Sequence, residues 1–119
     1  MRHFLVLVHL LFTVYVSTAW AQVTQRVVDI PTRPGVTQRI ALLSSGNPKS
    51  AVILFPGGHG GLQITPNGSF KWGEGNFLVR TRDMFAAQGL LVAIVDAPSD
   101  RQSPPYLSGF RQTPEHVAD

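Results

Sequence analysis

The sequence contains no cysteine, and this absence excludes several classes of protein. Without cysteine there is no disulfide framework, no thiolate nucleophile and no thiol for lipid attachment. Charged residues are also scarce, at 14% of 119 positions, and the formal net charge is only +3. The arginines are scattered and are not interleaved with aromatic residues, so no nucleic-acid partner is expected. The length allows one domain or part of one.

An apolar run long enough to cross a membrane is also missing. Residues 4–16 form the longest such run, but a membrane-spanning helix needs roughly 20 apolar residues, and polar residues interrupt this one. Arg2 precedes the run, and Ala19-Trp20-Ala21 follows it as a small-x-small cleavage signal. We therefore interpret residues 1–21 as a secretory signal peptide, with a membrane anchor as the alternative. Residues 22–119 would then be exported, secreted or periplasmic, with no stable membrane insertion.

Residues 51–61 join an apolar stretch to a glycine-rich one. The first five, Ala-Val-Ile-Leu-Phe, predict a strand covered on both faces in the middle of a parallel sheet. The next six, Pro56-Gly57-Gly58-His59-Gly60-Gly61, are named the glycine loop here. Glycine lets a ligand approach the backbone and permits φ > 0 conformations that turn N–H groups toward an anion. Because ligands collect at the carboxyl ends of strands in open α/β sheets, the glycine loop is a candidate site, with a tight turn as the alternative.

Before this loop, the sequence predicts an antiparallel hairpin. Residues 26–30 and 37–43 have strand character, and Pro34-Gly35 fits the central pair of a type II turn. Near the other end of the chain, Thr113-Pro114-Glu115 predicts the start of a helix.

After the glycine loop, a helix and a further strand are expected. Asn76 predicts the start of a helix that ends before Gly89. Its apolar face would consist of Phe77, Thr81, Met84 and Phe85. Residues 90–95 would follow as a buried strand, parallel to residues 51–55 through a right-handed crossover. The predicted class is therefore α/β.

The long passage over residues 62–75 is a second candidate for function. Loops longer than about 12 residues are usually functional or disordered. Phe70 and Trp72 give the passage apolar surface suited to lining a pocket, although a self-packed surface loop explains them equally well. Asn67-Gly68-Ser69 fits an N-glycosylation acceptor, but an Asn-Gly turn is the interpretation we favour.

The hairpin, the glycine loop, the helix and the strand ending in Asp96 together resemble the N-terminal portion of the α/β-hydrolase family. That family uses a Ser-Asp/Glu-His triad with the serine on a G-x-S-x-G turn, and a glycine loop after an early strand completes the oxyanion hole. The resemblance implies that Gly57 and Gly58 are the oxyanion-hole donors. Their neighbours His59, Trp72 and Asp96 are then candidates for binding the substrate.

A nucleophile is what this sequence most clearly lacks. No serine of residues 22–119 has the flanking glycines of G-x-S-x-G. Ser108, with Gly109 beside it, comes nearest, but its surroundings do not predict a strand-to-helix turn. His59 and His116 have no evident serine partner. In the resembling family the nucleophile and its base would come later, beyond Asp119.

Cofactor motifs are missing as well. The glycines do not form G-x-G-x-x-G, because Gln63 occupies the third position, and the histidines and aspartates lack the spacing of metal ligands. We therefore expect no metal and no cofactor. The function expected is that of a truncated exported serine hydrolase, inactive alone, whose intact parent acts on a small-molecule ester or related acyl bond. The alternative is a non-catalytic exported α/β binding module.

The apolar strand has a further implication. Residues 51–55 contain neither lysine nor proline, and in the resembling fold one edge of this strand pairs with a strand that would follow Asp119. An unpaired edge of this kind is an aggregation hazard. Self-association is therefore expected.

Overall fold

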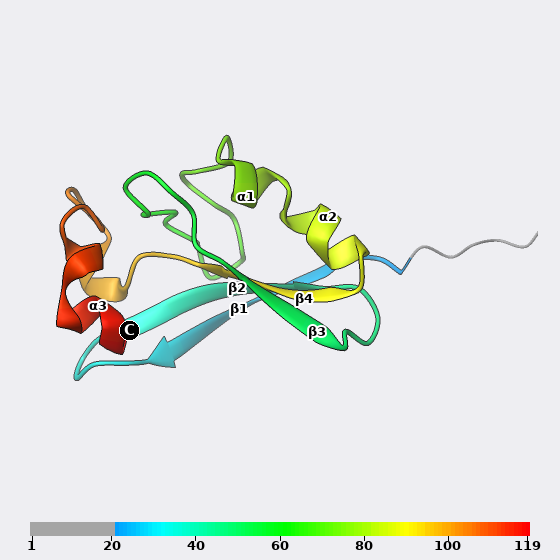
Figure 1. Ribbon diagram of the computed structural model, residues 1–119, viewed down its shortest axis with the longest axis horizontal. Coiled ribbons are helices and arrows are strands. Elements are labelled where there is room, and N and C mark those ends of the chain that lie inside the picture. Colours follow the sequence, from blue (N-terminus) through cyan, green and yellow to red (C-terminus); the bar gives the residue numbers. More distant parts are fainter. Residues whose placement is uncertain (1–20) are drawn as a thin grey trace, which may run out of the picture.

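The computed structural model describes residues 21–119, so the expected signal peptide lies outside the described residues except for Ala21. The described chain forms a mixed four-stranded sheet with a few short helices, an α/β-type arrangement (Figure 1). The spatial order of the strands is β1-β2-β4-β3. Their bounds are β1 Thr24–Pro31, β2 Thr37–Ser44, β3 Ser50–Leu54 and β4 Leu90–Val95.

The first two strands confirm the predicted hairpin. β1 and β2 pair antiparallel, with Val28 opposite Ile40. In the turn between them, the Val36 N–H donates to the Arg33 carbonyl at 2.9 Å, and Gly35 has a φ of 73°. A type II turn requires a positive φ at that position, which glycine adopts without steric cost.

The β3 and β4 strands pair parallel, which confirms the predicted strand–helix–strand unit. Val52 lies opposite Val92, and Leu54 opposite Ile94. Two short helices, α1 (Phe77–Arg80) and α2 (Arg82–Ala87), make the crossover. Figure 1 shows both helices on one face of the sheet, so the core lies between them and that face. The fully buried members of this core are Ala41, Leu43, Val79, Ala86, Val92 and Ile94.

The position of β3 corrects one prediction. Its five apolar residues were expected to be covered on both faces, yet Ile53 is 58% exposed and Phe55, just past the strand, is 64% exposed. The reason is that, within residues 21–119, helices cover only the face toward which Val52 and Leu54 point. β3 also pairs with β4 alone, so one edge of β3 is unpaired in the described chain.

The crossover helix departs from its prediction in two ways. Asn76 caps it as expected, its side chain accepting from the Leu78 N–H at 3.0 Å. However, the helix is interrupted at Thr81, whose hydroxyl donates to the Phe77 carbonyl at 2.6 Å and whose φ and ψ are −100° and 2°. A side chain that bonds back to the preceding turn competes with helix continuation. Gly89 follows α2 with a φ of 82°, as predicted.

The predicted apolar face of this helix is also largely wrong. Phe77 and Met84 are exposed, whereas Val79 and Ala86 are fully buried. Phe85 does pack against the core. These helices carry apolar residues on two sides, and the prediction from sequence spacing chose the side that faces away from the sheet.

The long passage over residues 62–75 packs on itself. Ile64 bridges to Phe70, and the two are buried in the core. Between them, the Gly68 N–H donates to the Thr65 carbonyl at 2.9 Å, which confirms the Asn-Gly turn. Trp72 is 56% exposed. This is the self-packed alternative.

The remaining residues form short helical turns at one end of the sheet (Figure 1). They are η1 (Ser99–Arg101), η2 (Phe110–Gln112) and α3 (Pro114–Ala118). Thr113 caps α3 and Pro114 occupies its first turn, as predicted. Between residues 21 and 119, no helix has the length and apolar character needed to cross a membrane.

Candidate functional site

The glycine loop leaves the carboxyl end of β3 with an open side and a packed side. A Cβ atom built on Gly57 or Gly58 would meet no atom within 4 Å. A Cβ on Gly60 would lie 2.5 Å from the Leu107 Cδ1 atom, and one on Gly61 would collide with the Tyr106 ring. The first two glycines therefore leave room for a ligand, whereas the last two permit close packing.

The packed side is formed by residues 104–112, which we name the covering segment. The Tyr106 ring stacks on His59 with centroids 4.3 Å apart. The Leu107 N–H donates to the His59 carbonyl at 2.9 Å. Arg111 donates to the carbonyls of Pro56 and Gly58, at 3.2 and 2.7 Å. The loop is thus fixed along one side by a segment about 50 residues further along the chain.

Asp96, at the end of β4, anchors the residues that follow the glycine loop. Asp96 is buried, with 2% of the residue exposed. It accepts backbone hydrogen bonds from Leu62 at 2.7 Å, Gln63 at 3.2 Å, Ile64 at 2.8 Å and Ala97 at 2.7 Å. A buried carboxylate is stable only when such donors compensate for lost water. Its lone pairs are committed to the backbone, so the geometry gives Asp96 a positioning role in place of substrate contact.

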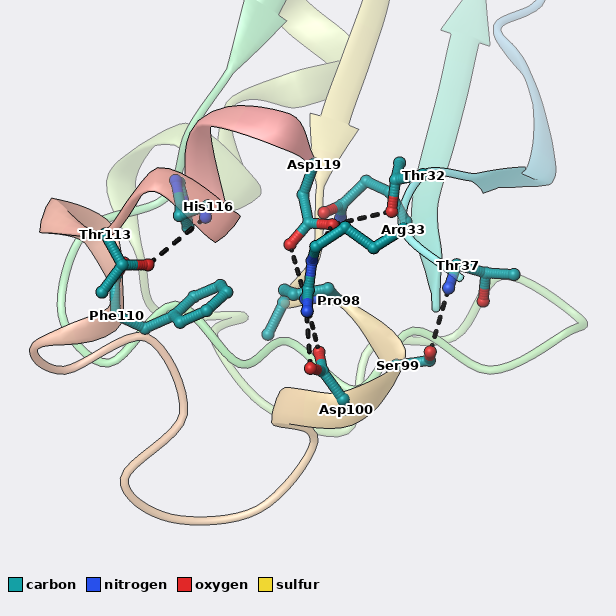
Figure 2. Close-up of polar contacts among 12 residues, drawn as sticks. Thr32, Arg33, Thr37, Pro98, Ser99, Asp100, Phe110, Thr113, His116 and Asp119 are labelled. Atoms are coloured by element: carbon teal, nitrogen blue, oxygen red, sulfur yellow. Dashed lines mark hydrogen bonds and ion pairs between the residues drawn. The ribbon is translucent and has the colours of Figure 1, made fainter. Parts of the chain in front are cut away.

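The residues on either side of the covering segment, Asp100 and Asp119, are tied to the β1–β2 turn (Figure 2). Arg33, in the β1–β2 turn, donates to both Asp119 carboxylate oxygens at 2.8 Å and to Asp100 at 3.0 Å. The hydrogen bond from Arg33 lowers the pKa of Asp119 below its ordinary value and, reciprocally, raises the pKa of Arg33. Thr32 also donates to Asp119, at 2.7 Å.

Phe110 forms the apolar part of the same anchor. Its ring lies under two guanidinium groups, with the Arg101 Cζ atom 4.3 Å and the Arg33 Cζ atom 5.4 Å from its centroid. His116 of α3 meets the ring edge-on at 5.4 Å. Cation–π contacts of this kind contribute about 0.5–2 kcal/mol each. Phe110 and Leu107 are buried together with Ala97, in a small core separate from the main one.

A cavity of about 360 Å³ lies at the same edge of the sheet. Most of its lining residues have polar side chains, among them Asp29, Arg39, Gln63, Lys71, Asp96 and Ser99. Arg39 donates to both oxygens of Asp29 at 2.7 Å, and this hydrogen bond lowers the pKa of Asp29. A third Arg39 nitrogen donates to the Ile64 carbonyl at 2.9 Å. The lining contains no residue of the glycine loop, so the cavity and the open side of the loop are different places.

The structure brings some predicted site residues together and separates others. Gly57 and Gly58 lie on the open side of the glycine loop, and Asp96 is joined to the residues just after it. His59 is exposed, but its ring is occupied by stacking and by accepting the Gly61 N–H at 3.1 Å. Trp72 is exposed and does not line the 360 Å³ cavity.

The covering segment was not found by sequence reasoning. Tyr106 and Arg111 belong to no recognised sequence motif. The residues around Arg111 therefore do not indicate what its side chain binds. The one available hint was Gly60-Gly61, because glycines beyond those needed for a turn often permit a close approach of another segment.

The described residues do not assemble a serine nucleophile or a metal centre. Among residues 21–119, no serine hydroxyl hydrogen-bonds to His59 or His116. Within the same range, no three histidine or acidic side chains lie close enough together to hold a metal ion. Ser108, the nearest match to a nucleophile by sequence, is exposed in the covering segment, where its N–H donates to the Pro105 carbonyl at 3.0 Å.

The sequence matches no protein-family model and no curated protein, and the fold matches no solved structure. The functional argument therefore depends on the geometry of the glycine loop and on the residues that hold it.

Proposed function

We propose that residues 22–119 are the N-terminal part of an exported serine hydrolase of the α/β-hydrolase type, acting on an ester or related acyl bond of a small molecule. In this proposal the glycine loop supplies backbone donors to the oxyanion. The serine, its base and the orienting acid come from polypeptide outside the described residues. Loop donors stabilise an oxyanion only after a nucleophile has generated it, so this chain alone is inactive.

The observation that carries the proposal is the open side of the glycine loop. Gly57 and Gly58 follow a strand of a parallel pair, at the carboxyl end where ligands bind in α/β sheets. A Cβ atom built on either residue would meet no protein atom within 4 Å. Their N–H groups donate to no acceptor among residues 21–119, and they remain available to a ligand.

The first test measures chemistry directly. The chain is incubated with an activated aryl ester and, separately, with a serine-directed fluorophosphonate. We expect no turnover above buffer and no labelling. Stoichiometric labelling that disappears in Ser108→Ala and persists in Ser103→Ala would place the nucleophile within this chain and overturn the proposal. Ser103 is the matched control because both serines are exposed in or beside the covering segment.

The second test supplies the missing half. The chain is expressed together with the polypeptide encoded downstream of Asp119, and we expect ester turnover and labelling of a serine in the added part. A folded product without turnover would favour the non-catalytic exported binding module. The cavity of about 360 Å³ favours that second candidate, because it is a ligand-sized space that needs no nucleophile.

Export is part of the proposal and has its own test. N-terminal sequencing of secreted or periplasmic material is expected to begin at Gln22. An intact Met1 on membrane-bound protein would mean an anchor in place of a cleaved signal.

A further inference from the structure

The carbonyl groups of the glycine loop are held by one guanidinium and one backbone amide. Arg111 Nη1 donates to the Gly58 carbonyl at 2.7 Å, and Nη2 to the Pro56 carbonyl at 3.2 Å. The Leu107 N–H holds the His59 carbonyl at 2.9 Å. Because a guanidinium is planar and presents its donors as a rigid fork, Arg111 fixes two alternate carbonyls to the same side of the loop.

Peptide geometry converts these contacts into directions for the N–H groups. In a planar trans peptide unit, the carbonyl and the N–H of the next residue point in opposite directions. The Pro56 carbonyl points to Arg111, so the Gly57 N–H points away from it. By the same reasoning the His59 N–H points away from Arg111, and the Gly60 N–H points away from Leu107. Within the described part of the chain, these N–H groups donate to no protein acceptor.

The backbone conformation of the loop agrees with this arrangement. φ is negative at Gly57, +70° at Gly58, negative at His59 and +77° at Gly60. Left-handed residues such as Gly58 and Gly60 occur in the concave backbone arrangements that bind anions. Space for the anion exists beside Gly57 and Gly58, whereas the covering segment occupies the space beside Gly60.

The segment that carries Arg111 is itself held firmly. Arg111 belongs to η2, whose first residue, Phe110, is buried under the guanidinium groups of Arg33 and Arg101. Figure 2 shows Arg33 reaching from the β1–β2 turn to Asp119, at the end of α3. Arg111 is therefore presented from an anchored element, although its own side chain is exposed.

We propose that Arg111 is a positioning residue that turns the N–H groups of Gly57 and His59 toward a compact oxyanion, such as a phosphate, a carboxylate or a tetrahedral acyl intermediate. The donor pair thus becomes Gly57 and His59 in place of Gly57 and Gly58. The catalytic use of this pair rests on the proposed function, whereas the binding of an anion does not.

The test is a titration with inorganic phosphate, followed by two-dimensional NMR of the 15N-labelled chain. In the unsubstituted chain, we expect the amide signals of Gly57 and His59 to shift together, with one dissociation constant. Arg111→Gln and Arg111→Lys should each weaken this binding about tenfold, the equivalent of losing one hydrogen bond to a charged group. Arg80→Gln is the matched control, because Arg80 is an exposed arginine on α1, and it should leave binding unchanged.

The lysine variant separates orientation from charge. Lysine keeps the positive charge but lacks the fork that holds two carbonyls. Binding in Arg111→Lys equal to that of the unsubstituted chain would show that Arg111 merely attracts the anion, and the proposal would be wrong. A shift of the Gly58 amide without His59 would contradict the donor pair, and the absence of any shift in a folded chain would exclude the anion site.

These outcomes are distinguishable from failure of the proposed function. Phosphate binding that depends on Arg111, with no ester turnover after the downstream polypeptide is added, would leave the anion site intact and remove the hydrolase. Turnover that is insensitive to Arg111→Gln would support the hydrolase and overturn the positioning role.

Discussion

Replacing Asp96 by asparagine tests how the glycine loop is tied to the sheet. In the structure, Oδ1 accepts from Leu62, Gln63 and Ala97, and Oδ2 accepts from Ile64. Asparagine has nearly the same shape, but one of its two terminal atoms is a donor. In either orientation of the amide, at least one backbone N–H would face an NH₂ group.

The magnitude follows from the number and kind of these bonds. A hydrogen bond to a charged group contributes about 1.5–3 kcal/mol, and the bonds that remain lose their charge-assisted part. We expect Asp96→Asn to lower the free energy of unfolding by about 2–4 kcal/mol. Asp96→Ala would leave all four donors without their acceptor and would remove much of a stability that is only about 5–15 kcal/mol in ordinary domains.

The assay combines urea denaturation with hydrogen exchange. For an m-value of about 1–3 kcal/mol/M, the expected loss lowers the urea midpoint by about 0.7–4 M. Exchange at the Ile64 amide should accelerate more than exchange at Val92 in the centre of β4, because the loop loosens before the sheet. The matched control is Asp83→Asn, an exposed carboxylate in the first turn of α2, with an expected effect below about 1 kcal/mol.

One result would refute this reasoning. If Asp96→Asn destabilises the chain no more than Asp83→Asn does, and Ile64 exchanges at its original rate, then Asp96 does not hold the loop. Its buried carboxylate would then need a different explanation, and contact with a ligand would be the first to examine.

Three further predictions follow from the packing. Because the pKa of Asp119 is lowered in the folded state, its contribution to stability is present above the unfolded pKa and is lost as pH falls through the folded pKa. The difference in melting temperature between Asp119→Asn and the unsubstituted chain should therefore shrink on acidification. A difference that stays constant with pH would contradict the ion pair. Ile53→Lys, on the edge strand β3, should reduce self-association in sedimentation, and unchanged self-association would contradict the use of this edge. Gly61→Ala should lower the free energy of unfolding by about 1–3 kcal/mol, because the new methyl group collides with the Tyr106 ring. Gly57→Ala should change the free energy of unfolding little, because its methyl group meets no atom within 4 Å. Equal denaturation midpoints for the two variants would show that the covering segment moves aside to accommodate the methyl group.

Local chemistry explains which elements could be predicted. The Pro34-Gly35 turn, the Asn76 cap and the Thr113 cap each depend on residues within a few positions of one another, and all three are present. Parallel pairing of β3 and β4 was predicted from the helix expected between two apolar runs, because such crossovers join parallel strands. Such caps and turns can be predicted because the residues that determine them are close together in the sequence.

The errors have a different origin, because they depend on what lies across the fold. The helix face was misassigned because α1 and α2 have apolar residues on two sides, and only the sheet decides that Val79 and Ala86 point inward. The burial expected for Ile53 required a second layer of helices, which is not found among residues 21–119. A five-residue apolar run indicates that its residues favour burial, but it does not indicate that another element is present to cover them.

At the candidate site, the sequence predicted where the site residues lie more successfully than it predicted what each residue does. The glycine loop and Asp96 were expected at one edge of the sheet, and there Asp96 accepts a hydrogen bond from Leu62, the residue that follows the loop. A carboxylate at a strand end serves equally well as a ligand contact or as a backbone anchor, and the choice depends on which N–H groups surround it. Arg111 was missed because its two acceptors are backbone carbonyls. Every residue has a backbone carbonyl, so the sequence does not indicate which ones a side chain will contact.

The link between Arg33 and Asp119 also sets an order of events during synthesis. Its two partners are 86 residues apart in sequence. At about 5–20 residues per second, roughly 4–17 s pass between synthesis of the β1–β2 turn and synthesis of the acid that secures it. During that interval the β1–β2 turn lacks its ion pair with Asp119. We therefore expect the hairpin, which depends on contacts between neighbouring residues, to form before the contacts that depend on α3.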